Sequence, residues 1–229
     1  MRKTINIIFA LVLLQLIHGG SLRAQGHDDL LPLSETAWVG LITCEPSNDL
    51  YTSFSHTALH VCDTARGINL VYNYGTFDFA TPHFVWKFAT RTLDYCLSRE
   101  PYVAFINDYT YQRRAVWEQR LKLSRQEACN LFVLLEHNYR PENRWYRYDF
   151  FRDNCATRVR DIIATALNHR TLLTPNTPQH PLTLRQLYHS QTPNNPWWNL
   201  AIDLLTGPKI DQPLNTLQYT FLPSHLATQ

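Results

Sequence analysis

The stretch Tyr148-Asp149-Phe150-Phe151-Arg152-Asp153-Asn154-Cys155-Ala156-Thr157-Arg158 decides the fold that this sequence predicts. Asp153 and Asn154 are residue types that favour a helix N-cap, and Cys155–Leu167 continues with apolar residues at helical spacing. These apolar positions are Cys155, Val159, Ile162, Ile163 and Ala166. The stretch therefore predicts a helix that begins near Cys155 and turns this cysteine inward in its first turn.

A cysteine at a helix N-terminus has two possible roles. The partial positive charge of the helix end lowers the pKa of a thiol, and the free N–H groups there can stabilise an oxyanion during acyl transfer. Free cysteine is also among the most frequently buried residue types, so Cys155 could equally be an inert core side chain. Both readings stay open from local sequence alone.

A thiolate nucleophile also needs a histidine nearby in the fold. Nine histidines follow the first 24 residues: His27, His56, His60, His83, His137, His169, His180, His189 and His225. His56 and His60 differ from the others because they fall in a predicted core strand, where a period of two places them on the same face. One could be the base and the other a core residue. A zinc site on His56, His60 and Cys62 is disfavoured, because the His-x-x-x-His spacing suits a helix.

Outside this region the chain reads as an antiparallel sheet with helices packed on it, an α+β fold. Short runs of β-branched and aromatic residues predict strands over Trp38–Cys44, His56–Cys62, Ile68–Tyr74, Tyr102–Tyr109 and Trp145–Phe151. Ser124 and Glu127 form a capping box that predicts a helix over 125–138. Shorter helices are expected over Phe84–Thr90, Leu184–His189 and Trp197–Leu205. We predict a core over 25–170 and a proline-rich extension over 171–229 that wraps it.

Residues 1–24 resemble an export signal. Arg2 and Lys3 precede an apolar run from Ile5 to Ile17, which is too short to span a bilayer comfortably and is followed by small residues. An uncleaved anchor is the alternative. Removing the segment takes away three basic residues and no acidic one, which leaves a nearly neutral protein in the periplasm or outer cell envelope. Its five cysteines cannot all pair within one chain, and the sequence does not show which remain free.

The composition excludes several classes of protein. The net charge of +2 and the absence of basic runs argue against a nucleic-acid binder. Only 7 glycines occur and no phosphate-binding fingerprint is present, so a nucleotide site is not expected. No metal or organic cofactor is implied.

Several ordered motifs resemble the periplasmic domain at the N-terminus of Lnb-type bacterial lipoprotein N-acyltransferases. They are Leu41–Cys44, Leu50–Leu59, Val71–Phe79, Pro141–Arg144, Tyr148–Arg158, Ile202–Gly207 and Phe221–Pro223. The resemblance implies a circularly rearranged relative of papain-type, NlpC-like and lecithin:retinol acyltransferase-like folds, in which a strand histidine precedes an Asn-Cys at a helix start.

The resemblance also implies roles for individual residues. Cys155 would be the nucleophile and His56 the base, and Asn73 on the next strand would orient the imidazole, with Asp78 as a weaker candidate. Tyr148 and Asn154 would line the site, and these two residues and Asp78 would contact the substrate.

Three functions are then open. A thiol acyltransferase would take an acyl group from a phospholipid or lipoprotein ester and pass it to an amine, with membrane-surface contact or a membrane partner. A cysteine peptidase or amidase acting on cell-wall peptide would use the same groups. A non-catalytic envelope binding module would need neither a reactive cysteine nor a base. An acyl donor requires an apolar groove, which Phe77, Phe79, Phe84, Trp86, Trp197 and Trp198 could supply.

Overall fold

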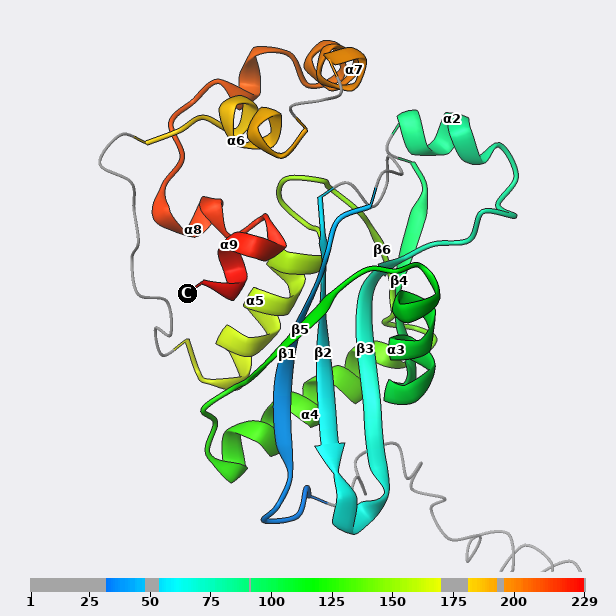
Figure 1. The fold of residues 1–229 in the computed structure, drawn as a ribbon, viewed down its shortest axis with the longest axis vertical. Helices are drawn as coiled ribbons and strands as arrows, with labels where there is room; N and C mark the ends of the chain where they lie inside the picture. The colour runs from blue at the N-terminus through cyan, green and yellow to red at the C-terminus, as the bar shows by residue number, and fades with distance from the viewer. Residues whose placement is uncertain (1–31, 48–53, 91, 170–180, 193–195, 229) are drawn as a thin grey trace, which may run out of the picture. The chain divides into compact units, whose positions relative to one another are not determined.

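The computed structural model contains a six-stranded antiparallel sheet in the order β5-β1-β2-β3-β4-β6 (Figure 1). Its strands are β1 (Trp38–Cys44), β2 (His56–Asp63), β3 (Ile68–Thr76), β4 (Asp94–Pro101), β5 (Val116–Arg120) and β6 (Trp145–Arg147). The structure describes residues 32–47, 54–90, 92–169, 181–192 and 196–228. The predicted export signal, Arg170 at the end of the predicted core and residues 171–180 of the predicted proline-rich extension lie outside these ranges.

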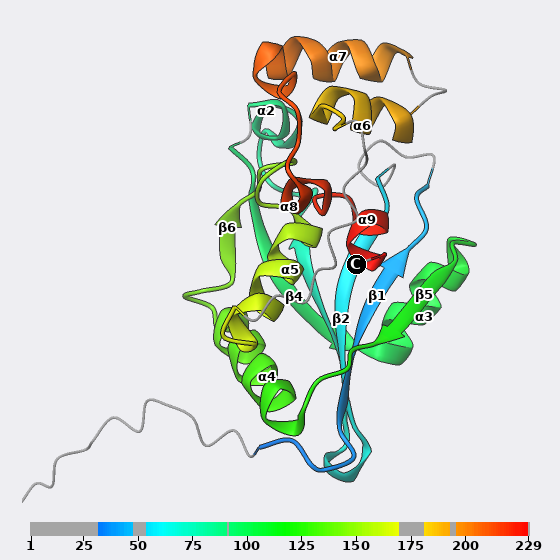
Figure 2. The ribbon, with the colours of Figure 1, turned by 90° about the vertical axis from the view of Figure 1, so that its left-hand side faces the viewer.

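Helices cover both faces of the sheet and continue beyond it. They are α2 (Phe84–Ala89), α3 (Tyr102–Tyr111), α4 (Arg125–Tyr139), α5 (Cys155–Ala166), α6 (Leu184–Gln191), α7 (Pro196–Thr206), α8 (Thr216–Tyr219) and α9 (Pro223–Ala227), with 3-10 turns η2 (Thr64–Arg66) and η3 (Gly207–Ile210). Figure 2 shows α4 and α5 on one face and α3 on the other. The fold is therefore α+β, as the sequence predicted.

Alternation along the strands assigns side chains to the two faces. Ile42, Cys44, Ala58 and Val71 point toward α3 and pack against Phe105 of that helix. The hydroxyls of Tyr72 and Tyr74 reach the other face, where they meet Glu136 and Asn138 of α4. Since His56 and Asn73 share the alternation of the first set, they lie on the α3 face.

The strands β2 and β3 part at one end. Their ladder runs from Asp63↔Ile68 to Leu59↔Tyr72, whereas β2 stays paired with β1 as far as Cys44↔His56. On the other side β3 stays paired with β4, with a bulge between Tyr74 and Thr76. The first residues of β2 and the last residues of β3 therefore flank a gap in the sheet, and the candidate site lies there.

Most predicted elements are present, but one is wrong. Tyr102–Tyr109 was predicted as a strand, and it is the helix α3. Its partly or fully buried positions, 102, 105, 106 and 109, repeat at helical spacing and face the sheet. Aromatic and β-branched residues along this segment favour a strand, and packing against the sheet overrides that preference. The predicted strand over Trp145–Phe151 is shorter than expected and ends at Arg147, while β4 and β5 were not predicted.

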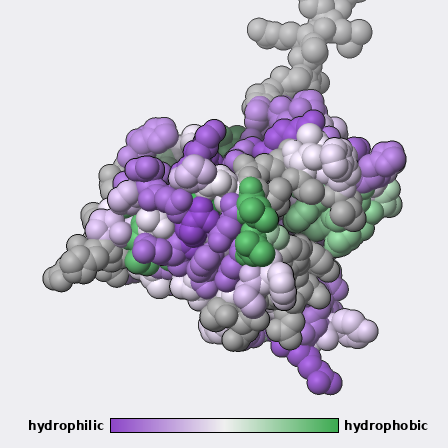
Figure 3. All heavy atoms as spheres, turned by 90° about the horizontal axis from the view of Figure 1, so that it is seen from above, coloured by the Kyte–Doolittle hydropathy of each residue, from purple (hydrophilic) through white to green (hydrophobic). Residues whose placement is uncertain are grey.

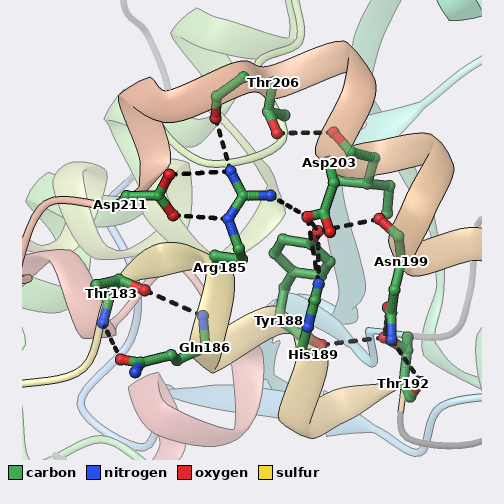
Figure 4. A network of polar contacts seen from close by, with 12 residues as sticks. Thr183, Arg185, Gln186, Tyr188, His189, Thr192, Asn199, Asp203, Thr206 and Asp211 are labelled. Atoms are coloured by element: carbon green, nitrogen blue, oxygen red, sulfur yellow. Dashed lines mark hydrogen bonds and ion pairs between the residues drawn. The ribbon is translucent and has the colours of Figure 1, made fainter. Parts of the chain in front are cut away.

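A polar network holds α6 to α7 and η3 (Figure 4). Arg185 forms a two-bond contact with Asp211 through Nε at 2.6 Å and Nη2 at 3.1 Å, and its Nη1 contacts Asp203. Asp203 also accepts from the Tyr188 hydroxyl and contacts His189 Nε2 at 3.2 Å. Tyr188 in turn packs with Phe151 and Phe221 in a second core beside the sheet.

Three further observations concern chemistry and location. All five cysteines are buried and unpaired. Within the described ranges, no group of three or more metal-ligating side chains could hold an ion. Among the same residues, no helix has the length and apolar character needed to cross a bilayer.

Candidate active site

Cys155 is the first residue of α5, and it is 6% exposed. The helix is capped by Asn154, whose Oδ1 accepts the Thr157 N–H at 2.9 Å while Thr157 Oγ1 accepts the Asn154 N–H at 2.8 Å. The Asn154 amide nitrogen donates to the carbonyls of Phe150 and Phe221, each at 2.8 Å. This capping box fixes where α5 begins and so fixes the position of Cys155.

The residues just before Cys155 form a tight turn. Asp149 and Asp153 form an isolated bridge, and Asp149 Oδ1 accepts the N–H groups of Phe151 and Arg152 at 3.0 Å. Asp153 binds Arg158 through two hydrogen bonds of 2.6 and 2.7 Å. The Arg158 guanidinium lies 3.4 Å from the ring centroid of Tyr146. The polar residues of this motif thus hold the backbone that presents Cys155.

His56 forms a hydrogen bond with the Cys155 side chain. Burial alone would raise the pKa of Cys155, but the charge of His56 and hydrogen bonds from His56, the Thr57 backbone N–H and Tyr148 lower the pKa below its usual value. Burial alone would lower the pKa of His56, but Cys155 and Asn73 raise it. Each of the two groups therefore favours the charged form of the other.

Asn73 contacts the other side of the imidazole. Its Oδ1 lies 3.1 Å from His56 Nε2, and its Nδ2 donates to Glu100 Oε1 at 2.7 Å. With Nε2 occupied, His56 has Nδ1 left for the sulfur of Cys155. The structure thus brings three predicted residues together in the order Cys155, His56, Asn73, and it adds Glu100 on β4.

Gly75 makes room for Cys155 at the gap between β2 and β3. Its φ is +92°, and a Cβ at this position would lie 3.2 Å from Tyr148 Cε2 and 3.8 Å from Cys155 Cβ. Tyr148 stacks on Tyr95 with ring centroids 4.4 Å apart, and its hydroxyl contacts both the side chain and the backbone of Cys155. The bulge of β3 therefore lets Cys155 reach His56 from the α5 side of the sheet.

A cavity of about 620 Å³ opens beside His56 on the α3 face. Its polar lining includes His56, Asn73, Glu100, Asp108 and Arg114, and its aromatic lining comes from Phe79, Phe105 and Tyr109. Sequence reasoning did not find Glu100, Asp108 or Tyr109. The last two lie on α3, which the sequence suggested was a strand, and no motif connects Glu100 with the cysteine.

The other polar residues that the sequence singled out make hydrogen bonds outside the series Cys155–His56–Asn73. Asp78 is exposed and its Oδ1 accepts the Ala80 N–H at 2.8 Å, so it stabilises a turn. Asn154 uses both ends of its amide in the cap described above. His60 is a core residue, with Nδ1 2.6 Å from Glu118 and Nε2 2.6 Å from Asn69. Substrate contacts by Asp78, Asn154 or Tyr148 stay predictions.

One aromatic cluster borders the cavity, and two tryptophans elsewhere on the surface are exposed. Phe79, which is 58% exposed, lines the cavity and packs on Phe77 and Phe84 with centroids 4.9 and 5.0 Å apart. Trp86 on α2 and Trp197 on α7 are 70% and 80% exposed. Figure 3, which looks down on this end of the molecule, shows hydrophobic side chains in separate patches among polar ones.

Comparison with known proteins gives one match. The family model for the Lnb N-terminal periplasmic domain matches residues 28–190, a range that contains Cys155, His56, Asn73 and Glu100. Neither the comparison with curated proteins nor the comparison with solved structures gave a match. The description of this family indicates an exported, periplasmic protein. Because the matched range covers most of the chain, the chain belongs to the Lnb N-terminal periplasmic domain family.

Proposed function

We propose that this protein is a thiol acyltransferase of the cell envelope, with Cys155 as nucleophile, His56 as base and Asn73 as the residue that orients the imidazole. The observation that carries the proposal is the hydrogen-bonded series Cys155–His56–Asn73, which begins at the N-terminus of α5. His56 and Asn73 of this series line the cavity. A low thiol pKa and a histidine held by a third polar group are what nucleophilic catalysis by cysteine requires.

The reaction has two steps. The Cys155 sulfur attacks the carbonyl carbon of a lipid or lipoprotein ester, a thioester forms, the ester C–O bond breaks, and the alcohol leaves with the proton of the His56 imidazolium. A primary amine then attacks the thioester, the C–N bond forms and the C–S bond breaks, and His56 accepts the proton of the amine. N–H groups in the first turn of α5 and the Tyr148 hydroxyl are the candidate donors to the oxyanion of each step.

The surroundings of the cavity fit both substrates. Phe79 and its aromatic neighbours offer an apolar edge for an acyl chain, and the carboxylates of Glu100 and Asp108 suit a polar, cationic acceptor. A phospholipid or lipoprotein would supply the acyl group, which places the protein at a membrane surface or beside a membrane partner.

The test is to trap the thioester. The mature protein is incubated with a synthetic diacylated lipopeptide or a short-chain phospholipid, quenched in acid and analysed by mass spectrometry of its peptides. We expect the mass of one acyl group on the peptide that contains Cys155, no adduct in Cys155→Ser, and a normal adduct in Cys129→Ser, which removes another buried thiol.

Addition of an amine should discharge the thioester to an amide. Discharge to free acid alone would indicate the hydrolase, a peptidase or amidase that uses the same groups. A Cys155 that forms no adduct with an ester or a peptide donor and reacts no faster with iodoacetamide than an ordinary thiol would contradict catalysis and favour a binding module.

A further inference from the structure

Glu100 is the last member of the hydrogen-bonded series that begins at Cys155. It lies on β4 opposite Val71, while Ser98 on the same strand lies opposite Asn73. Glu100 is therefore diagonal to Asn73 on the α3 face of the sheet, a distance that long side chains can bridge. The bond of 2.7 Å from Asn73 Nδ2 to Glu100 Oε1 makes that contact.

We propose that Glu100 is a positioning residue for the site: it holds the Asn73 amide so that His56 carries its proton on Nε2 and turns Nδ1 toward Cys155. The inference rests on the proposed function and deepens it, because it names Glu100 as the residue that selects the tautomer of His56 able to accept the thiol proton.

Donor and acceptor chemistry supports each step. An ionised carboxylate only accepts hydrogen bonds, so the Asn73 group that faces Glu100 is the NH₂. The group that faces His56 is then the carbonyl oxygen, which also only accepts. His56 Nε2 must therefore be the donor, at 3.1 Å. In the neutral imidazole this arrangement leaves Nδ1 as the acceptor for the thiol proton.

Glu100 also acts on His56 through its charge, and neighbouring charged residues act on both. Burial and the charge of Asp108 on α3 raise the pKa of Glu100 above the usual carboxyl value, whereas the hydrogen bond from Asn73 and the charge of His56 oppose this rise. Arg114, which follows α3, acts on His56 and donates to the Glu45 carbonyl through Nε and Nη2. A negative charge at Glu100 thus also favours the imidazolium form of His56, which in turn stabilises the Cys155 thiolate.

The experiment compares the pH dependence of Cys155 alkylation by iodoacetamide in the full mature protein and in four variants. Glu100→Gln keeps the size of the side chain, but its NH₂ can donate to a flipped Asn73 amide, which then favours the unreactive tautomer. We expect Glu100→Gln to react about tenfold more slowly near pH 6, with the acid limb of the profile displaced upward by about one pH unit. Glu100→Asp, which keeps the carboxylate, should recover most of the rate.

The matched control is Glu118→Gln, because Glu118 contacts His60, the other histidine on this face of β2. It should leave the profile of Cys155 unchanged. The fourth variant, His56→Ala, separates the two hypotheses. If wild-type protein reacts fast at low pH and His56→Ala does not, the site is activated. A Glu100→Gln profile equal to that of the wild type then refutes the role of Glu100 alone.

If the wild-type Cys155 is slow, the proposed function fails and the inference fails with it. If Glu100→Asp is as slow as Glu100→Gln while circular dichroism shows that both are folded, the carboxylate is not what positions Asn73. Either result overturns the proposal.

Discussion

Replacing Gly75 with alanine tests whether the bulge of β3 is what admits Cys155 to the gap in the sheet. The new Cβ would lie 3.2 Å from Tyr148 Cε2, which is tighter than an ordinary van der Waals contact. The Tyr148 ring cannot retreat freely, because it stacks on Tyr95. The substitution should therefore displace the hydroxyl of Tyr148 and the sulfur of Cys155.

The size of the effect can be worked out against a matched glycine. Gly67 has φ +67° and nothing within 4 Å of its added Cβ, so Gly67→Ala measures the conformational cost by itself. That cost is about 1–2 kcal/mol, offset by about 0.4–1 kcal/mol from the stiffer unfolded chain. We expect a loss of about 1 kcal/mol for Gly67→Ala. For Gly75→Ala we expect about 2–3 kcal/mol, because its φ of +92° is less favourable and its Cβ meets Tyr148.

Urea unfolding gives both free energies of unfolding, and alkylation by iodoacetamide gives the reactivity of Cys155. Both variants should be less stable than the wild type, but only Gly75→Ala should slow the alkylation of Cys155. Equal losses of stability, or unchanged alkylation in Gly75→Ala, would show that the bulge does not position the cysteine.

Three other predictions concern the cap, the thiolate and the polar network. Asn154→Ala should lower the free energy of unfolding by about 2 kcal/mol, measured in urea, because it removes the acceptor for the Thr157 N–H and leaves two carbonyls without their donor. Cys155 should keep its alkylation rate at pH values where ordinary thiols have become unreactive, and lose it only when the pH falls through its lowered pKa. A rate profile like that of a free thiol would count against an ion pair with His56. Burial raises the pKa of Asp203, but its hydrogen bonds with Tyr188, His189 and Arg185 and the charge of Arg185 lower the pKa below its usual value. The stability that Asp203 contributes is therefore full above the ordinary carboxyl pKa and is lost as the pH falls through the lowered value. Asp203→Asn should therefore cost about 1.5–3 kcal/mol at pH 7 and little in acid, in thermal unfolding followed by circular dichroism.

Local patterns predicted the elements that carry the site. The capping box at Ser124 and the N-cap at Asn154 mark the starts of α4 and α5, and both are present. Alternation placed His56 and His60 on one face, which is correct. These signals succeed because they depend on neighbours within a few positions in the chain.

The failures involve residues that depend on distant partners. The helix α3 has the composition of a strand, and its identity is decided by packing on the sheet. Glu100 has no local signature, because its partner Asn73 lies 27 positions away and on a different strand. Alternation also could not decide which histidine faces the cysteine, because it places His56 and His60 on the same face. What distinguishes them is that β2 has parted from β3 at His56 but not at His60.

The cap of α5 has a consequence for how the protein matures. One of the two carbonyls that hold Asn154 belongs to Phe221, which lies 67 positions further along the chain. A polypeptide that is exported from its N-terminus and folds as it emerges would have His56, Asn73 and Cys155 across the membrane well before Phe221. The last hydrogen bond of the cap forms only when Phe221 arrives, so completion of the helix that begins at Cys155 is delayed until the 67 residues after Asn154 have been delivered.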